Sequence, residues 1–190
     1  MDIFKSRRSI RNYQTKMIKE NELAEILEAG SFAPSGGNNQ TTHRIVITNK
    51  GILQELEKLV VQEFAKMQIV DNMYKSMKNS ILRSKKGNYF YDYQAPVLVI
   101  TANKKGYGNA IADSACMIEN MMLKATELNI GSCWINQLHW LDDNQVIKEK
   151  LLSLGLNEDE TVTGGVVFGY IKNQPKTPLK RTGNKITRID

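Results

Sequence analysis

Apolar residues recur at helical spacing in three otherwise polar segments, and each recurrence predicts an amphipathic helix. The first helix lies between Asn21, a suitable N-cap residue, and Gly30, a suitable stop, with Pro34 ending any continuation. The second begins near Gly51, and the third covers residues 143–154. The apolar positions that define the first two helical faces are Leu23, Ile26 and Leu27, then Leu53, Leu56, Val60, Phe64 and Met67.

Three runs rich in β-branched residues predict strands between these helices. Residues 44–48 form the first run, and residues 96–101 form a continuous apolar run that fits a strand buried on both faces. Residues 161–170 form the last run, in which Gly164-Gly165 indicates a bulge or a close backbone approach. Residues 71–90 give mixed signals, and for them we expect a mobile or partly irregular helix.

The segment from Ala110 to Leu128 predicts a further helix that is apolar on nearly every side. Such a helix is expected to be buried on all sides, and its small residues and methionines suit close packing across a subunit interface. Helices and strands alternate without a repeat or a linker. We therefore expect one α+β domain over residues 1–190, with residues 172–190 as an extended basic arm.

Composition narrows the class of protein without identifying a function. The chain has 190 residues, of which 41% are hydrophobic and 24% are charged, as is typical of a soluble globular domain. The first residues lack the features of a signal peptide, so we expect a cytoplasmic protein in which Cys116 and Cys133 are reduced and buried. The net charge of +6 suits an anionic partner, although solvated surface lysines explain most of it.

Several common catalytic motifs are absent from the sequence. There is no Gly-x-Gly-x-x-Gly at a strand-to-helix junction, no Gly-Lys-Ser/Thr phosphate loop and no serine-hydrolase elbow. His43 and His139 have no Cys or acid at ligand spacing, so we expect no metal site. If the protein is an enzyme, a bound cofactor is therefore expected to carry the reaction, without a dedicated catalytic side chain.

Two short segments remain as candidates for binding a ligand. Arg7-Arg8-Ser9-Ile10-Arg11 combines a hydroxyl group with several guanidinium groups, whose planar donors match phosphate oxygens. Ala33-Pro34-Ser35-Gly36-Gly37-Asn38-Asn39-Gln40 is a turn between a helix and a strand that offers backbone amides and small polar side chains. From charge alone, a solvated helix face or a nucleic-acid-binding arm explains the arginines better than a ligand site does.

These two segments, followed by Asn120-Met121-Met122-Leu123 and Gly131-Ser132-Cys133-Trp134-Ile135, resemble the nitroreductase family of flavoproteins in order and spacing. The resemblance covers nearly the whole chain. It implies an α+β fold with a central, mostly antiparallel sheet packed by helices, and an interlocked homodimer with FMN at the interface. The activity it implies is electron transfer from NADH or NADPH to a nitro compound, a quinone or a similar small acceptor, by a ping-pong mechanism.

The resemblance also assigns residues to the flavin site. Arg7, Arg8, Ser9 and Arg11 would bind FMN from one subunit, with Arg7 and Ser9 near the phosphate. Arg11 would lie near the pyrimidine edge, where a cation stabilises the negative charge of the reduced flavin. The partner subunit would contribute Pro34, Ser35, Gly36 and Asn38. Backbone donors near flavin N5 and O4 would come from Gly131 and Ser132, and further phosphate contacts from Lys180 and Arg181.

One departure from the family pattern is visible after the Asn-x-Gln element. The family often continues with Pro-Trp, whereas this chain continues with Thr41-Thr42-His43, so we expect a different pocket floor or partner contact there. Tyr89, Phe90, Tyr91 and Tyr93 either line a substrate pocket or serve as ordinary core aromatics. A dehalogenase, flavin-modifying or ring-oxidising enzyme of the same fold, and a basic nucleic-acid-binding module, are alternative interpretations.

Overall fold

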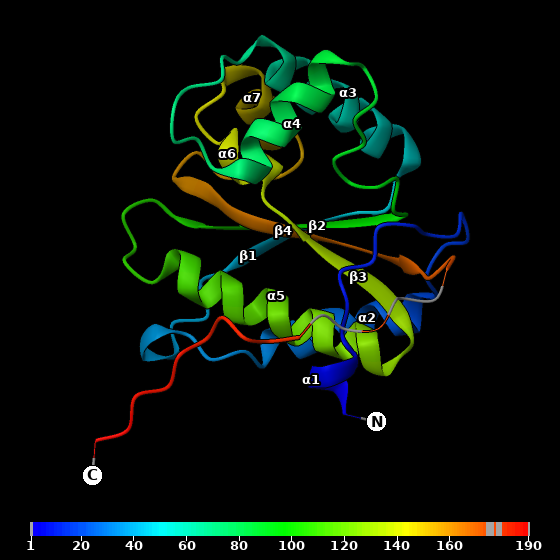
Figure 1. Ribbon diagram of the computed structural model, residues 1–190, viewed down its shortest axis with the longest axis vertical. Helices are drawn as coiled ribbons and strands as arrows, with labels where there is room; N and C mark the ends of the chain where they lie inside the picture. Colours follow the sequence, from blue (N-terminus) through cyan, green and yellow to red (C-terminus); the bar gives the residue numbers. More distant parts are fainter. Residues whose placement is uncertain (1, 174–176, 178–179, 190) are drawn as a thin grey trace.

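The fold is built on one four-stranded antiparallel sheet, as shown by a computed structural model that describes residues 2–173, 177 and 180–189 (Figure 1). The strand order is β1-β2-β4-β3, and each pair of neighbours is antiparallel. The strands are β1 (His43–Ile47), β2 (Val97–Lys104), β3 (Ile130–Ile135) and β4 (Glu160–Tyr170). The predicted strands are confirmed, and residues 97–103 of β2 are all buried, as a strand covered on both faces requires.

Two layers of helices cover the sheet (Figure 1). One layer contains α1 (Ile3–Ser6), α2 (Glu20–Ser31) and α5 (Ala110–Glu127), and the other contains α3 (Lys50–Lys66), α4 (Lys75–Lys85), α6 (Gln137–Trp140) and α7 (Gln145–Ser153). Side chains of β2 alternate between the two cores: Val97 and Val99 pack with α2 and α5, while Leu98 and Ile100 pack with the opposite layer. The α+β class and the central antiparallel sheet are therefore confirmed.

The predicted helix faces are confirmed, but one predicted cap is wrong. Helix α2 begins at Glu20 after Lys19, so Asn21 lies inside its first turn rather than at the N-cap. Glu20 and Glu22 occupy that turn, where acidic side chains interact favourably with the helix dipole. Asn49 is the side chain that caps α3, accepting a hydrogen bond from Ile52 N at 3.1 Å.

Residues 71–90, for which the sequence predicts a mobile or partly irregular helix, contain the regular helix α4 (Lys75–Lys85) with turns and coil on both sides of it. Its inward face is made of Ile81 with two buried serines, Ser80 and Ser84. The Ser80 hydroxyl shares a hydrogen bond of 2.7 Å with Tyr89 OH, so a polar residue occupies a core position. The inward face of α4 is therefore less apolar than that of α3, whose buried positions include Leu53, Leu56, Val60 and Phe64.

The predicted irregularity at Gly164-Gly165 is confirmed. The pairing of β2 with β4 shifts register between Thr101 and Ala102, so that Thr163 has no direct partner across the strands. The Thr163 hydroxyl instead donates to Ser114 Oγ at 2.7 Å, which ties the bulge to α5. A Cβ atom on Gly165 would lie 3.3 Å from the carbonyl oxygen of Val99, so the two backbones approach closely there.

Helix α5 is buried against the sheet but not on all sides of a single chain. Ile111 is 60% exposed, and Cys116 is exposed rather than buried, so the prediction for that cysteine is wrong for one chain. Cys133 is buried, as predicted. Phe4 and Phe32, on the same helical layer, are 74% and 79% exposed. This layer therefore carries large apolar side chains that the chain itself leaves uncovered.

Among the described residues, no helix is both long enough and apolar enough to cross a membrane.

Candidate functional site

The N-terminal arm lies along the edge of the sheet at β3. Ser9 pairs with Ser132 in a parallel bridge, and Ile10 N donates to the carbonyl oxygen of Ser132 at 2.8 Å. Gly131 permits this approach, because a Cβ atom there would lie 2.9 Å from Ile10 Cγ2. The structure thus brings together two predicted segments, residues 7–11 and Gly131–Ser132, that lie far apart in the sequence.

The three arginines of the arm are held in different ways. Arg7 Nε lies 3.5 Å from the Glu119 carboxylate on α5. Arg8 Nη1 donates to the backbone carbonyls of Lys5 and Arg7, each at 2.6 Å. Arg11 Nε donates to Tyr93 OH at 3.2 Å. Only Arg7 has an acidic partner among these contacts, so the arm presents concentrated positive charge suited to an anion.

Arg11 lies in a partly enclosed aromatic environment. Its guanidinium is 5.6 Å from the centroid of the Tyr93 ring, a cation–π distance. Burial acts to lower the pKa of Arg11, but the neighbouring Cys133 and Tyr93 outweigh it and the pKa is raised. Burial is also the main cause that raises the pKa of the Cys133 thiol and of the Tyr93 phenol. Arg11 therefore stays charged and Tyr93 stays protonated at neutral pH.

Tyr93 is a residue that sequence analysis left between two interpretations. Tyr93 and the following Gln94 both have a φ of 54°, a backbone conformation that residues other than glycine rarely adopt. The Asp92 carboxylate stabilises this turn by accepting a hydrogen bond from Gln94 N at 2.9 Å. The strained turn places the Tyr93 phenol against Arg11, so Tyr93 belongs to the candidate site.

Two buried polar atoms at this edge have no hydrogen-bond partner within the described part of the chain. They are the Ser132 hydroxyl oxygen and Arg8 Nε. A buried polar group without a partner is costly, and a bound ligand commonly satisfies such groups. An anionic ligand with both donors and acceptors, such as a flavin mononucleotide, fits the arginines and the unpaired hydroxyl together.

The Pro34–Asn38 turn lies at a different position on α5. Its short 3-10 segment η1 (Gly36–Asn38) is attached to the start of the helix through Asp113, whereas Arg7 contacts Glu119 further along. The helical rise between these contacts is about 9 Å, and they differ by roughly 120° around the axis. Within one chain, the turn and Arg7 therefore contact different sides of α5.

No hydrogen bond or ion pair of the described residues joins the predicted tail residues Lys180 and Arg181 to the N-terminal arm, and their assignment to the flavin site stays a prediction. Lys180 and Arg181 lie in an exposed coil. Residues 174–176, 178–179 and 190 of the predicted arm lie outside the described residues.

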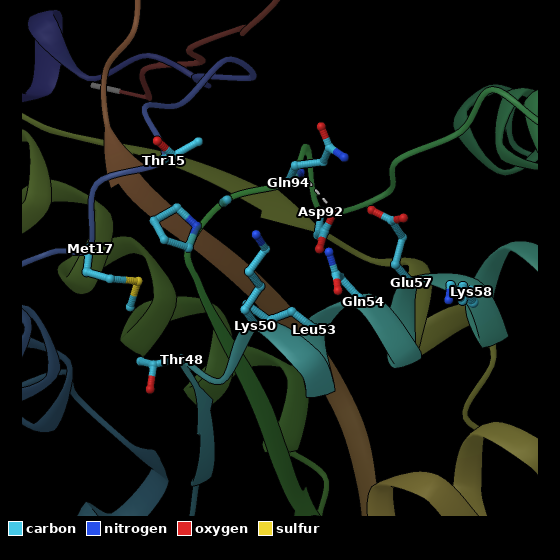
Figure 2. Close-up of a pocket in the computed structure, with 12 residues that line it drawn as sticks. Thr15, Met17, Thr48, Lys50, Leu53, Gln54, Glu57, Lys58, Asp92 and Gln94 are labelled. Atoms are coloured by element: carbon cyan, nitrogen blue, oxygen red, sulfur yellow. Dashed lines mark hydrogen bonds between the residues drawn. The ribbon is translucent and has the colours of Figure 1, made fainter.

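A separate cleft of about 450 Å³ opens beside α3 (Figure 2). Its walls come from the N-terminal loop, the first turns of α3 and the segment before β2. Glu57 and Asp92 both line it. Burial and the neighbouring Asp92 raise the pKa of Glu57 to about 7, and burial raises the pKa of Asp92. Sequence analysis missed this pair because the two residues come from distant segments.

Comparisons with known proteins agree with this arrangement. The model of the Nitroreductase family matches residues 4–170. A nitroreductase with bound FMN from Bacteroides fragilis is 37% identical, with a TM-score of 0.87, and the match covers 100% of this chain and 97% of that one. A nitroreductase with bound FMN from Desulfitobacterium hafniense is 25% identical, with a TM-score of 0.84 and coverage of 99% and 96%.

A protein from Archaeoglobus fulgidus described as a putative NADH dehydrogenase/NAD(P)H nitroreductase is 27% identical over 173 residues, which are 89% of this chain and 83% of that protein. The family match spans every segment that carries the resemblance and all four strands. The chain belongs to the nitroreductase family.

Proposed function

We propose that this protein is an FMN-dependent oxidoreductase that passes electrons from NADH or NADPH to a nitro compound, a quinone or a similar small acceptor. Membership of the nitroreductase family makes it an oxidoreductase, and similar structures from two bacteria hold FMN. The donor and the acceptor occupy the same place in turn, which gives ping-pong kinetics. The absence of a Rossmann motif fits this scheme, because the nicotinamide nucleotide binds only transiently.

The observation that carries this proposal is the junction of the arginine arm with β3. Arg7 and Ser9 would hold the phosphate end of FMN, Arg11 would face the pyrimidine edge of the ring, and Arg8 would bind FMN beside them. The Ser132 hydroxyl, which is buried and has no partner within the described chain, would bond to the bound cofactor. When bound, FMN supplies the redox chemistry, and these residues bind it and orient it.

A second copy of the chain would complete the site. Arg7 and the Pro34–Asn38 turn contact different sides of α5 within one chain, while Phe4, Phe32 and Ile111 leave an apolar surface uncovered. A homodimer that covers this surface would bring the turn of one subunit to the flavin of the other. Pro34, Ser35, Gly36 and Asn38 then act on the partner's cofactor.

The arginines fit a nucleic-acid arm less well. Arg8 donates to two backbone carbonyls and Arg11 donates to a tyrosine, so both guanidinium groups already have partners within the chain. A strand of nucleic acid is contacted by side chains that follow its backbone at the surface.

Flavin binding and steady-state kinetics test the proposal together. We expect the purified protein to bind added FMN as a dimer and to oxidise NADH or NADPH when an electron acceptor is present. Initial rates measured over a grid of donor and acceptor concentrations should give parallel double-reciprocal lines. Failure to bind FMN would refute the proposed cofactor, whereas intersecting lines would refute only the ping-pong order.

A further inference from the structure

We propose that Asp113 and Tyr107 are positioning residues that hold the Pro34–Asn38 turn in the shape that binds the flavin of the second subunit. The inference rests on the proposed function, because it assumes that this turn binds FMN. It assigns a role to a buried carboxylate and a phenol that lie outside the sequence segments resembling the family.

The backbone of Gly36 is held at both of its polar groups. Gly36 N donates a hydrogen bond to Asp113 Oδ1 at 3.0 Å, and Tyr107 OH donates one to Asp113 Oδ2 at 2.9 Å. The same phenol lies 3.3 Å from the carbonyl oxygen of Gly36. Asn39 Nδ2 donates to the phenol oxygen at 3.4 Å. One carboxylate and one phenol thus connect the turn to the body of the protein.

The Asp113 carboxylate is buried and accepts a hydrogen bond at each of its oxygens. The side chain is in the first turn of α5, where the unpaired amides of the helix favour negative charge. The residue is only 6% exposed. Hydrogen bonds to a buried charged acceptor are stronger than those between neutral groups, so this contact is a firm attachment.

The attached turn has a conformation that needs support. Gly37, Asn38 and Gln40 have φ of 60°, 57° and 52°, all in the left-handed region. Residues other than glycine adopt that region at an energetic cost, and such strain persists where surrounding contacts impose it. Ser35 Oγ accepts a hydrogen bond from Gln40 N at 3.0 Å, which closes the turn on itself but does not attach it to α5.

The attachment also explains why glycine occupies position 36. A Cβ atom there would lie 2.1 Å from Asn109 Nδ2 and 2.8 Å from Tyr107 OH. Residues 37–40 are exposed and contribute nothing to either core. The partly buried hydrogen bonds to Asp113 and Tyr107 therefore fix the shape of a surface segment, and a fixed surface shape is what a ligand or a partner requires.

The test compares Asp113→Asn and Tyr107→Phe with the wild type in FMN titrations followed by the visible spectrum of the flavin. In Asp113→Asn, the amide nitrogen replaces one acceptor oxygen and opposes a donor, so we expect FMN affinity to fall about 10-fold or more. Tyr107→Phe should lower the affinity less, by about 3-fold to 10-fold. Asp143→Asn, which changes an exposed aspartate before α7, is the matched control and should bind FMN normally.

Thermal unfolding without added FMN separates positioning from folding. Lost affinity in Tyr107→Phe with an unchanged Tm supports the inference, and unchanged affinity in that variant overturns it even where Asp113→Asn fails to fold. Wild-type protein that binds no FMN would refute the proposed function and this inference with it. If both variants bind FMN as tightly as the wild type does, the inference is refuted and the proposed function stands.

Mixed dimers show on which subunit the turn acts. An Asp113→Asn subunit has an altered turn and intact arginines, whereas an Arg11→Ala subunit has an intact turn and lacks one arginine. If each turn binds the flavin of the other subunit, a mixed dimer combines the intact arginines of the first subunit with the intact turn of the second. Such a dimer therefore contains one unaltered site and one doubly altered site. Co-expression of the two variants should then restore about a quarter of wild-type activity, because half of the dimers are mixed and each holds one unaltered site. No recovery above the separate variants would contradict action on the partner's flavin.

Discussion

The paired carboxyl groups of Glu57 and Asp92 make the stability of the fold depend on pH. Glu57 is partly buried on α3 and faces Asp92 across the cleft in Figure 2. Burial and Asp92 raise the pKa of Glu57 from an ordinary 4.5 to about 7. The folded protein therefore keeps a proton on the pair over a pH range in which the unfolded chain has released it.

The sign of the effect follows from this difference. The stability gained from binding the proton is fully present below about pH 4.5, falls as the pH rises, and is lost above about pH 7. A pKa difference of that size corresponds to at most about 3.4 kcal/mol. Because solvent reaches Glu57 and two lysines, Lys50 and Lys58, line the same cleft, screening reduces the expected effect to about 1–2 kcal/mol.

Glu57→Gln replaces the protonated acid by a neutral amide at every pH. We expect the variant to match the wild type near pH 5 and to exceed its free energy of unfolding by about 1–2 kcal/mol at pH 8. Urea unfolding from pH 5 to pH 8, at fixed protein and FMN concentrations, measures this difference. Glu28→Gln on the exposed side of α2 is the control and should keep the wild-type pH profile. A Glu57→Gln profile that parallels the wild type would show that the pair does not share a proton.

Three further substitutions test the site and the packing around it. Arg11→Ala should weaken FMN binding or lower the reduction potential of the bound flavin while leaving Tm nearly unchanged, and loss of folding would instead indicate a structural role. Tyr93→Phe removes the hydrogen bond to Arg11 Nε but keeps the ring, so we expect a smaller change in the same direction, measured by potentiometric titration. Gly30→Ala should lower the free energy of unfolding by about 1–3 kcal/mol, because the added Cβ would lie 2.8 Å from Met121 Cγ on α5. Urea titrations measure this change. An unchanged unfolding midpoint would show that Met121 repacks freely around the added methyl group.

Much of the fold follows from local sequence patterns. Leu56, Val60 and Phe64 recur at helical spacing because α3 buries one face, and all three are fully buried. The continuous apolar run of β2 reflects its position between two helical layers. Helix α4 departs from its pattern because Ser80 is buried with a hydrogen-bond partner from another segment, which residue type alone does not reveal.

The site is predictable only in part. The arginines and the glycine-rich turn stand out by composition, and their resemblance to a family supplies their expected roles. The pairing of Ser9 with Ser132 joins segments more than a hundred residues apart, so no local pattern indicates it. Asp113 is one acidic residue at the start of an apolar helix, and its function depends on a bond to Gly36, which is 77 positions away. Long-range contacts of this kind are properties of the tertiary structure.

Anaerobic rapid mixing of the FMN-loaded protein tests the central claim most directly. We expect NADH or NADPH to bleach the visible absorbance of the bound flavin, and a nitro compound or a quinone added afterwards to restore it. Each half-reaction should proceed in the absence of the other substrate. Bound flavin that neither nicotinamide nucleotide reduces would contradict the account, even if the protein binds FMN tightly.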